Sequence, residues 1–136
     1  MLGKTPFTIQ GFGDVNYFAN PGQGQHSGFH DGAFEFFVTS RLSDHWSVLA
    51  ELVFEPDGNE LSTDLERFQI TYERSDAFRI SVGRVHSPIM RWSVTNHHGL
   101  FMETPVDNPI IARWEDKSGL WPLHFVGLLA SGRRSG

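Results

Sequence analysis

The sequence predicts an all-β chain of about six antiparallel strands. Two observations carry this prediction. Side chains alternate between apolar and polar in several segments, with the period of two that is typical of strands whose two faces differ. These segments are joined either by short polar turns or by much longer connections. No stretch approaches the roughly 18 consecutive apolar residues that a membrane-spanning helix requires, so a helical membrane protein is excluded.

The first expected strand is 7–18. Its apolar side carries Phe7, Ile9, Val15 and Tyr17. Gly11 and Gly13 fall on the same side, where glycine within a strand indicates a bend or a closely approaching neighbour.

The segments 32–42 and 46–55 form the clearest pair of strands. Their even positions are Phe34, Phe36, Val38, Ser40 and Leu42, then Trp46, Val48, Ala50, Leu52 and Phe54. Both apolar rows share one face only if Leu42 pairs with Trp46 across the loop Ser43-Asp44-His45. A two-residue turn would place the two rows on opposite faces.

The segments 66–73 and 77–86 follow the same arithmetic. We expect Tyr72 to pair with Phe78 across the loop Arg74-Ser75-Asp76, which again keeps the apolar residues together. A last strand, 122–131, is more apolar throughout and less clear in its alternation.

The remaining connections are long. They are expected at 19–31, 56–65 and 87–121, all at the end of the sheet opposite the short turns. Outer-membrane barrels show this asymmetry, and a strand of about 10–12 residues tilted near 45° spans roughly the height of their apolar band. The loop 87–121 is rich in apolar residues and has room for a short helix; it either enters the lumen as a constriction or packs on the rim.

Lipid and a second protein layer are both compatible with the alternation. The other face carries too many charged side chains for a packed interior, but they suit a water-filled lumen. Aromatic residues near the strand ends suit the girdles of a membrane barrel. We therefore expect an antiparallel up-and-down transmembrane β-barrel, present here in part. A soluble β-sandwich with its polar face in water is the alternative.

A resemblance to a known family supports the first interpretation. The segment GRVHSPIMRWSVTNHHGLFMETPVDNPIIARWED, followed by LWPLHFVGLLASG, resembles a stretch of porin-like outer-membrane proteins of Gram-negative bacteria. The matching positions are Gly83, Arg84, His86, Pro88, Ile89, Trp92, His97, His98, Gly99, Asp107, Pro109, Pro122 and His124 to Leu128. The resemblance implies a β-barrel in the bacterial outer membrane and brings no catalytic residues, so we expect neither enzyme activity nor a cofactor.

The chain is short for such a barrel. About six strands are fewer than the eight of the smallest single-chain bacterial barrels. We interpret the chain 1–136 as a single partial barrel domain, either the N-terminal portion of a larger barrel or a truncated gene product. Its expected partners are outer-membrane lipid and the remaining barrel strands or other protomers.

The expected function is passive passage of small hydrophilic solutes. The residues predicted to line the pore are Glu35, Arg41, Glu51, Arg67, Glu73, Arg79, Arg84, Arg91 and Arg113. Their mixed charge predicts a field across the pore with little net ion selectivity. A formal net charge of -5 argues against nucleic acid as a partner.

Histidines supply the alternative function, a soluble metal-binding module or enzyme. The candidate ligands of Zn²⁺ or Fe²⁺ are His86, His97, His98 and His124. Histidines that only bond the loop backbone explain the same residues. Cysteine is absent, which excludes disulfides and thiolate metal sites.

Overall fold

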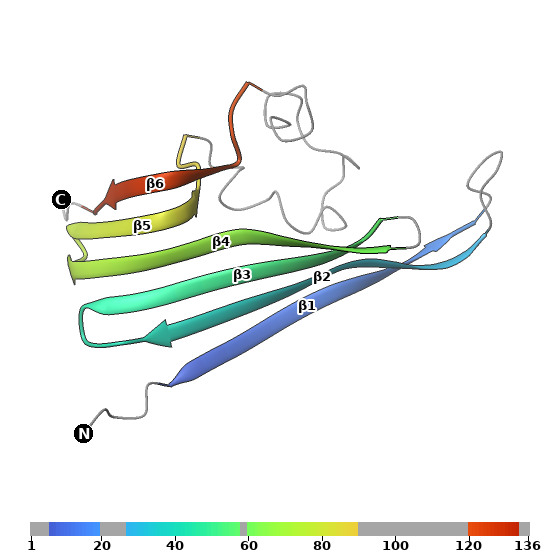
Figure 1. Ribbon diagram of the computed structural model, residues 1–136, viewed down its shortest axis with the longest axis horizontal. Helices are drawn as coiled ribbons and strands as arrows, with labels where there is room; N and C mark the ends of the chain where they lie inside the picture. Colours follow the sequence, from blue (N-terminus) through green and yellow to red (C-terminus); the bar gives the residue numbers. More distant parts are fainter. Residues whose placement is uncertain (1–5, 20–26, 58–59, 90–119, 134–136) are drawn as a thin grey trace.

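The computed structural model describes residues 6–19, 27–57, 60–89 and 120–133, which form one antiparallel sheet of six strands (Figure 1). The strands are β1 (Phe7–Phe18), β2 (Gly28–Arg41), β3 (Trp46–Asp57), β4 (Glu60–Ser75), β5 (Phe78–His86) and β6 (His124–Ser131). They lie in the sheet in the order in which they occur in the chain. None of these described residues forms a helix long and apolar enough to cross a membrane.

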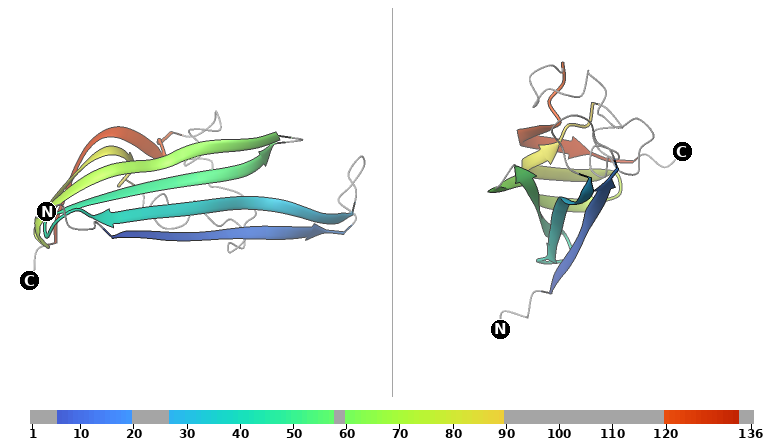
Figure 2. Two further views of the ribbon diagram at one scale, coloured as in Figure 1. Left: turned by 60° about the horizontal axis from the view of Figure 1, so that its bottom comes forward. Right: turned by 90° about the vertical axis from the view of Figure 1, so that its right-hand side faces the viewer.

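The sheet is curved and open. Viewed along its long axis, the strands follow an arc from β1 to β6 (Figure 2). β1 pairs only with β2, and β6 pairs only with β5, so the sheet is not closed into a barrel. The prediction of an all-β, antiparallel, six-stranded chain is confirmed at this level.

The first hairpin has the predicted loop. Arg41 pairs with Ser47, and the Leu42 amide donates to the Trp46 carbonyl at 2.9 Å. The hydroxyl of Ser43 accepts hydrogen bonds from the amides of His45 and Trp46 at 3.3 and 3.2 Å. These bonds stabilise the turn and keep the apolar rows of β2 and β3 on one face.

The second hairpin differs from the prediction. Tyr72 pairs with Ile80 rather than with Phe78, and the turn consists of Asp76 and Ala77. A two-residue turn alone would put the apolar rows on opposite faces. A β-bulge between Glu73 and Ser75 adds one residue to β4 and restores the match. The pairing was therefore predicted two residues out of register, although on the correct face.

The predicted long connection at 56–65 is wrong. β3 and β4 remain paired as far as Asp57 and Glu60. The cause is a bulge at Glu66, because Glu51 pairs with Arg67 whereas Leu52 pairs with Leu65. Beyond this bulge the apolar row changes from even to odd positions of β4, which interrupts the alternation in the sequence and conceals the start of the strand.

A register shift also lengthens β2, which begins at Gly28 instead of residue 32. Gly13 pairs with Phe34, but Val15 pairs with Asp31, so β2 carries one extra residue at this point. The outward positions of β2 therefore change from even to odd, and Phe29 joins the same face as Phe34.

The two long hairpins separate at one end of the sheet. β2 and β3 pair from Arg41 up to Phe34 and no further. The β1–β2 pairing continues to Gly28, and the β3–β4 pairing continues to Asp57. Beyond Phe34 the two hairpins therefore diverge as separate ribbons, as the left view of Figure 2 shows. We call this point the fork and the opposite end, which carries both tight turns, the turn end.

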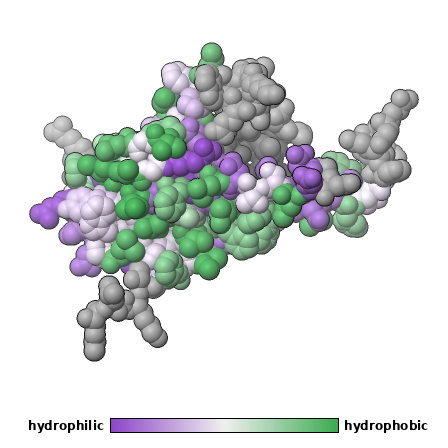
Figure 3. Space-filling model, in the orientation of Figure 1, coloured by the Kyte–Doolittle hydropathy of each residue, from purple (hydrophilic) through white to green (hydrophobic). Residues whose placement is uncertain are grey.

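One face of the sheet is apolar and open to the surroundings. A single row across all six strands runs Phe7, Ser40, Val48, Ile70, Val82 and Leu128. Figure 3 shows apolar residues gathered on this side. Its exposed members include Ile9, Val15, Tyr17, Phe29, Phe34, Trp46, Leu61, Leu65, Phe68 and Val126. We call this surface the apolar face.

The described residues bury little apolar volume of their own. The buried hydrophobic side chains among them are Val53, Val85 and Leu123. By contrast Glu35 and Glu51 on the opposite face, called here the polar face, are 2% and 0% exposed. The sheet therefore exposes many large apolar side chains and buries two carboxylates, whereas a water-soluble β domain buries most of its large apolar residues and rarely buries a carboxylate.

Candidate functional site

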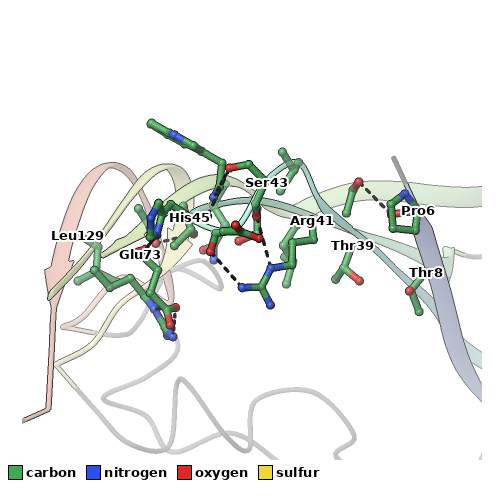
Figure 4. Close-up of a pocket in the computed structure, with 18 of the residues that line it drawn as sticks. Pro6, Thr8, Thr39, Arg41, Ser43, His45, Glu73 and Leu129 are labelled. Carbon is green, nitrogen blue, oxygen red and sulfur yellow. Dashed lines mark hydrogen bonds and ion pairs between the residues drawn. The ribbon is translucent and has the colours of Figure 1, made fainter. Parts of the chain in front are cut away.

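The polar face is hollowed near the turn end. The hollow has a volume of about 530 Å³ and is lined by side chains from every strand of the sheet (Figure 4). Serine and threonine are the most frequent residues in this lining, which also contains two arginines. Representative residues are Thr8, Thr39, Arg41, Ser47, Thr71 and Arg79. The inward positions of neighbouring strands bring these side chains together because the sheet curves toward this side.

Glu73 and Arg79 form an ion pair at the wall of the hollow. They are direct cross-strand partners on β4 and β5, and Arg79 Nε donates to Glu73 Oε2 at 2.8 Å. Their side chains are 40% and 50% exposed. Such accessible pairs contribute little to stability, so this pair chiefly fixes two opposite charges at the edge of the hollow.

Glu51 and Arg67 form a second pair, which is less accessible. They oppose each other on β3 and β4, and Arg67 Nε donates to Glu51 Oε2. The guanidinium also lies over the ring of Phe37, 5.8 Å from its centroid. Since Glu51 is fully buried, its carboxylate depends on this partner for compensation of its charge.

Arg41 is bound differently from Arg67, Arg79 and Arg84. Its Nε and Nη2 donate to the backbone carbonyls of Ser43 and Asp44 at 3.4 and 3.0 Å. These acceptors are neutral. Among the described residues, Arg67, Arg79 and Arg84 each approach a carboxylate within 4.0 Å, whereas Arg41 does not.

Arg84 does not share a row with the inward arginines. It pairs with Phe68 on one side and Val126 on the other, so its register position belongs to the apolar face. Its Nε donates to the carbonyl of Glu66 at 3.0 Å, and its Nη2 lies 3.9 Å from Asp64 Oδ2. Two further predicted pore residues, Arg91 and Arg113, lie outside the described residues.

Gly83, the residue before Arg84, allows β5 to lie unusually close to β4. Its φ of 133° is in a region that side-chain-bearing residues rarely adopt, and a Cβ there would lie 2.0 Å from the carbonyl oxygen of Phe68. Only glycine allows β4 and β5 to approach this closely. The strand therefore bends just before Arg84, Val85 and His86.

Two of the four predicted metal ligands lie side by side. His86 and His124 are cross-strand partners with ring centroids 4.9 Å apart, and both are buried. His124 Nε2 lies 2.8 Å from Glu66 Oε2, and His86 Nε2 lies 3.9 Å from Glu51 Oε2. His97 and His98 lie outside the described residues.

The histidine pair extends the Glu51–Arg67 pair into a buried polar cluster. No group of three or more His, Cys, Asp or Glu suited to a metal ion occurs in the part of the chain that the structure describes. The metal hypothesis therefore stays a prediction. Glu66 is not among the predicted site residues. Its bulge shifts the apolar residues of β4 from odd positions (Leu65) to even positions (Phe68), and this shift is the signal in the sequence that could have located it.

The hydroxyl lining of the hollow was also missed. Ser47, Thr71 and Ser81 occupy inward positions on consecutive strands, and the hydroxyls of Thr71 and Ser81 are 2.8 Å apart. Charged residues alone do not reveal this lining, although the odd-numbered positions of all three residues place them on the polar face.

Comparison of the chain with protein-family models, with curated proteins and with solved structures finds no match. The resemblance to porin-like proteins therefore continues to rest on the sequence positions given above.

Proposed function

We propose that this chain forms part of the wall of a bacterial outer-membrane β-barrel and that small hydrophilic solutes pass along its polar face. The observation that carries the proposal is the inverted character of the two faces. The apolar face is exposed, while on the polar face Glu51 and Glu73 each pair with an arginine across strands and Glu35 is buried. This arrangement suits lipid outside and water inside.

The apolar face is too extensive for a monomer in water. Phe34 and Trp46 are 45% and 46% exposed, and exposed apolar residues continue across all six strands. Soluble monomers rarely expose contiguous apolar patches larger than a few hundred Å². Hydrocarbon chains provide the cover that this surface requires, and no second protein layer lies over it within the described residues.

Aromatic residues lie near both ends of this surface. Trp46 and Tyr72 are cross-strand partners at the turn end, with ring centroids 5.1 Å apart. Near the fork, Phe36 contacts Phe34 and Phe54, with ring centroids at 4.6 and 5.9 Å. The distance along β3 from Trp46 to Phe54 is about 26 Å at about 3.3 Å per residue, and about 20 Å after a tilt of about 40°. This height is comparable to the apolar band of a barrel, roughly 25 Å.

The open edges of the sheet require partners. β1 and β6 each present a row of backbone donors and acceptors on the side away from the sheet. Hydrocarbon cannot satisfy these groups, so an open edge is not stable in a bilayer. We propose that further strands complete the wall, either from the same protein or from other protomers.

Quenching of Trp46 fluorescence by lipids tests the proposal. The protein is folded into vesicles whose acyl chains carry bromine, and its emission is compared with that of Trp46→Phe. We expect strong quenching that Trp46→Phe reduces, together with stepwise conductance in planar bilayers. Equal emission in brominated and plain lipid would contradict lipid contact. Quenching without conductance would leave a membrane barrel that does not conduct.

A further inference from the structure

We propose that the hollow at the turn end binds small hydroxylated carboxylates, of the sugar-acid class, with Arg41 holding the carboxylate group. The inference rests on the proposed function, because it names the class of solute that the polar face accepts. It is carried by the contacts of Arg41 and by the hydroxyl groups that follow it across the sheet.

Arg41 has hydrogen-bonding capacity left for a ligand. A guanidinium carries five N–H donors, and the two hydrogen bonds of the Arg41 side chain use Nε and one N–H of Nη2. Nη1 makes no bond to a described residue. Figure 4 shows the guanidinium at the hollow, joined only to the turn. Those two bonds hold its plane in place, which reduces the entropy cost of binding a carboxylate with two parallel hydrogen bonds.

The charge of Arg41 is also available. Glu73 lines the hollow but is bound to Arg79, so its charge is compensated. Asp44 is the other acidic residue in the lining, and its backbone carbonyl accepts a hydrogen bond from Arg41. The positive charge of Arg41 thus meets neutral carbonyls at contact distance, and the nearby carboxylate of Asp44 weakens the attraction for an anion without occupying the donors.

Hydroxyl groups continue from Arg41 in one cross-strand row. Arg41 pairs with Ser47, Ser47 with Thr71, and Thr71 with Ser81. Three intervals of about 4.8 Å between strands make a row of about 14 Å. A hydroxyl both donates and accepts, so the hydroxyl of Ser47 and the mutually bonded hydroxyls of Thr71 and Ser81 can each exchange a hydrogen bond with a polyol that enters the hollow. A carboxylate at one end and hydroxyls along the chain describe a sugar acid.

Binding of gluconate to the folded protein in detergent micelles tests the inference. Arginine side-chain Nε–Hε signals are followed by NMR during titration with sodium gluconate. Sorbitol is the uncharged match, and sodium chloride controls for ionic strength. We expect a saturable shift of the Arg41 signal with gluconate, and none with sorbitol or chloride at the same concentrations.

Substitutions locate the carboxylate. Arg41→Gln removes the charge and is expected to raise the dissociation constant about tenfold. Arg41→Lys keeps the charge without the planar fork and is expected to raise it about threefold. Asp44→Asn removes the competing charge but keeps the backbone carbonyl, and is expected to lower the dissociation constant about twofold. If Arg41→Gln does not fold, the opposite directions of the other two variants decide the question.

The outcomes separate this inference from the proposed function. Absence of a saturable gluconate shift, or sorbitol binding as tight as gluconate, overturns the inference. Asp44→Asn with weaker binding also overturns it. Conductance in bilayers without gluconate binding rejects the inference alone, whereas gluconate binding without conductance rejects the passage of solutes alone.

Discussion

Arg67 and Glu51 lie directly opposite each other on β4 and β3, and their ion pair compensates a carboxylate that is fully buried. The pair of Arg79 and Glu73, six residues further along β4, has the same chemistry at an accessible position. The structure therefore contains a natural comparison between a buried and an exposed cross-strand ion pair on one surface.

Removal of one partner should affect these pairs unequally. Glu51→Ala leaves Arg67 without its carboxylate and is expected to lower the free energy of unfolding by about 3 kcal/mol. Glu73→Ala is expected to lower it by less than about 1 kcal/mol. Urea unfolding of the protein in lipid vesicles measures both values. Equal effects would show that the carboxylate of Glu51 is not buried in the folded protein.

Arginine substitutions should distinguish the two faces of β4. Ile70 lies on the apolar face and its neighbour Gln69 lies on the polar face. In lipid, Ile70→Arg is expected to lower the free energy of unfolding by about 2–4 kcal/mol, and Gln69→Arg by less than about 1 kcal/mol. Folding into vesicles followed by urea unfolding gives the comparison. A larger effect at Gln69 would reverse the assignment of the faces.

Gly83→Ala should destabilise the protein strongly. The positive φ alone costs about 1–3 kcal/mol for a residue with a side chain, and the new Cβ would meet the carbonyl of Phe68 at 2.0 Å. Gly28→Ala is the matched control, because a Cβ there meets nothing within 4 Å. The midpoint of urea unfolding should fall for Gly83→Ala and stay within experimental error for Gly28→Ala.

Deletion of Arg74 should be tolerated. Arg74 is the extra residue of the bulge between Glu73 and Ser75, and its removal leaves the pairs Glu73–Arg79 and Ser75–Phe78 directly adjacent. Deletion of Thr71 is the control, because it moves the rest of β4 to the opposite face. Yield of folded protein after refolding in detergent is the measurement. Loss of folding on deletion of Arg74 would mean that the bulge is needed for more than register.

The strand pattern was largely predictable from alternation, and the main exceptions share one cause. The bounds of β1 and the loop of the first hairpin follow from an uninterrupted period of two. The three largest errors each fall at an extra residue, at Glu66 in β4, at Arg74 before the second turn and in β2 beside Gly13. A bulge changes which positions face outward, and a sequence does not show whether a broken alternation is a bulge or the end of a strand.

The polar face was predictable as a surface but not as a set of contacts. The alternation placed Glu51 and Arg67 on the same side, but their pairing depends on the register set by the short connection between β3 and β4. That connection was expected to be long, so the partners could not be assigned. The contact of His86 with His124 depends on the pairing of β5 with β6 and was likewise not available from spacing alone.

The fork beyond Phe34 and Phe54 separates a part of the sheet where neighbouring strands all pair from a part where the two hairpins are independent. Between the fork and the turn end, a change in an inner strand disturbs the strands on both sides of it. On the other side of the fork, the described residues of each ribbon pair only within that ribbon, so a change in one ribbon leaves the strand pairing of the other intact. A foreign peptide inserted after Phe18 or after Asp57 should therefore be displayed without loss of the six-stranded sheet.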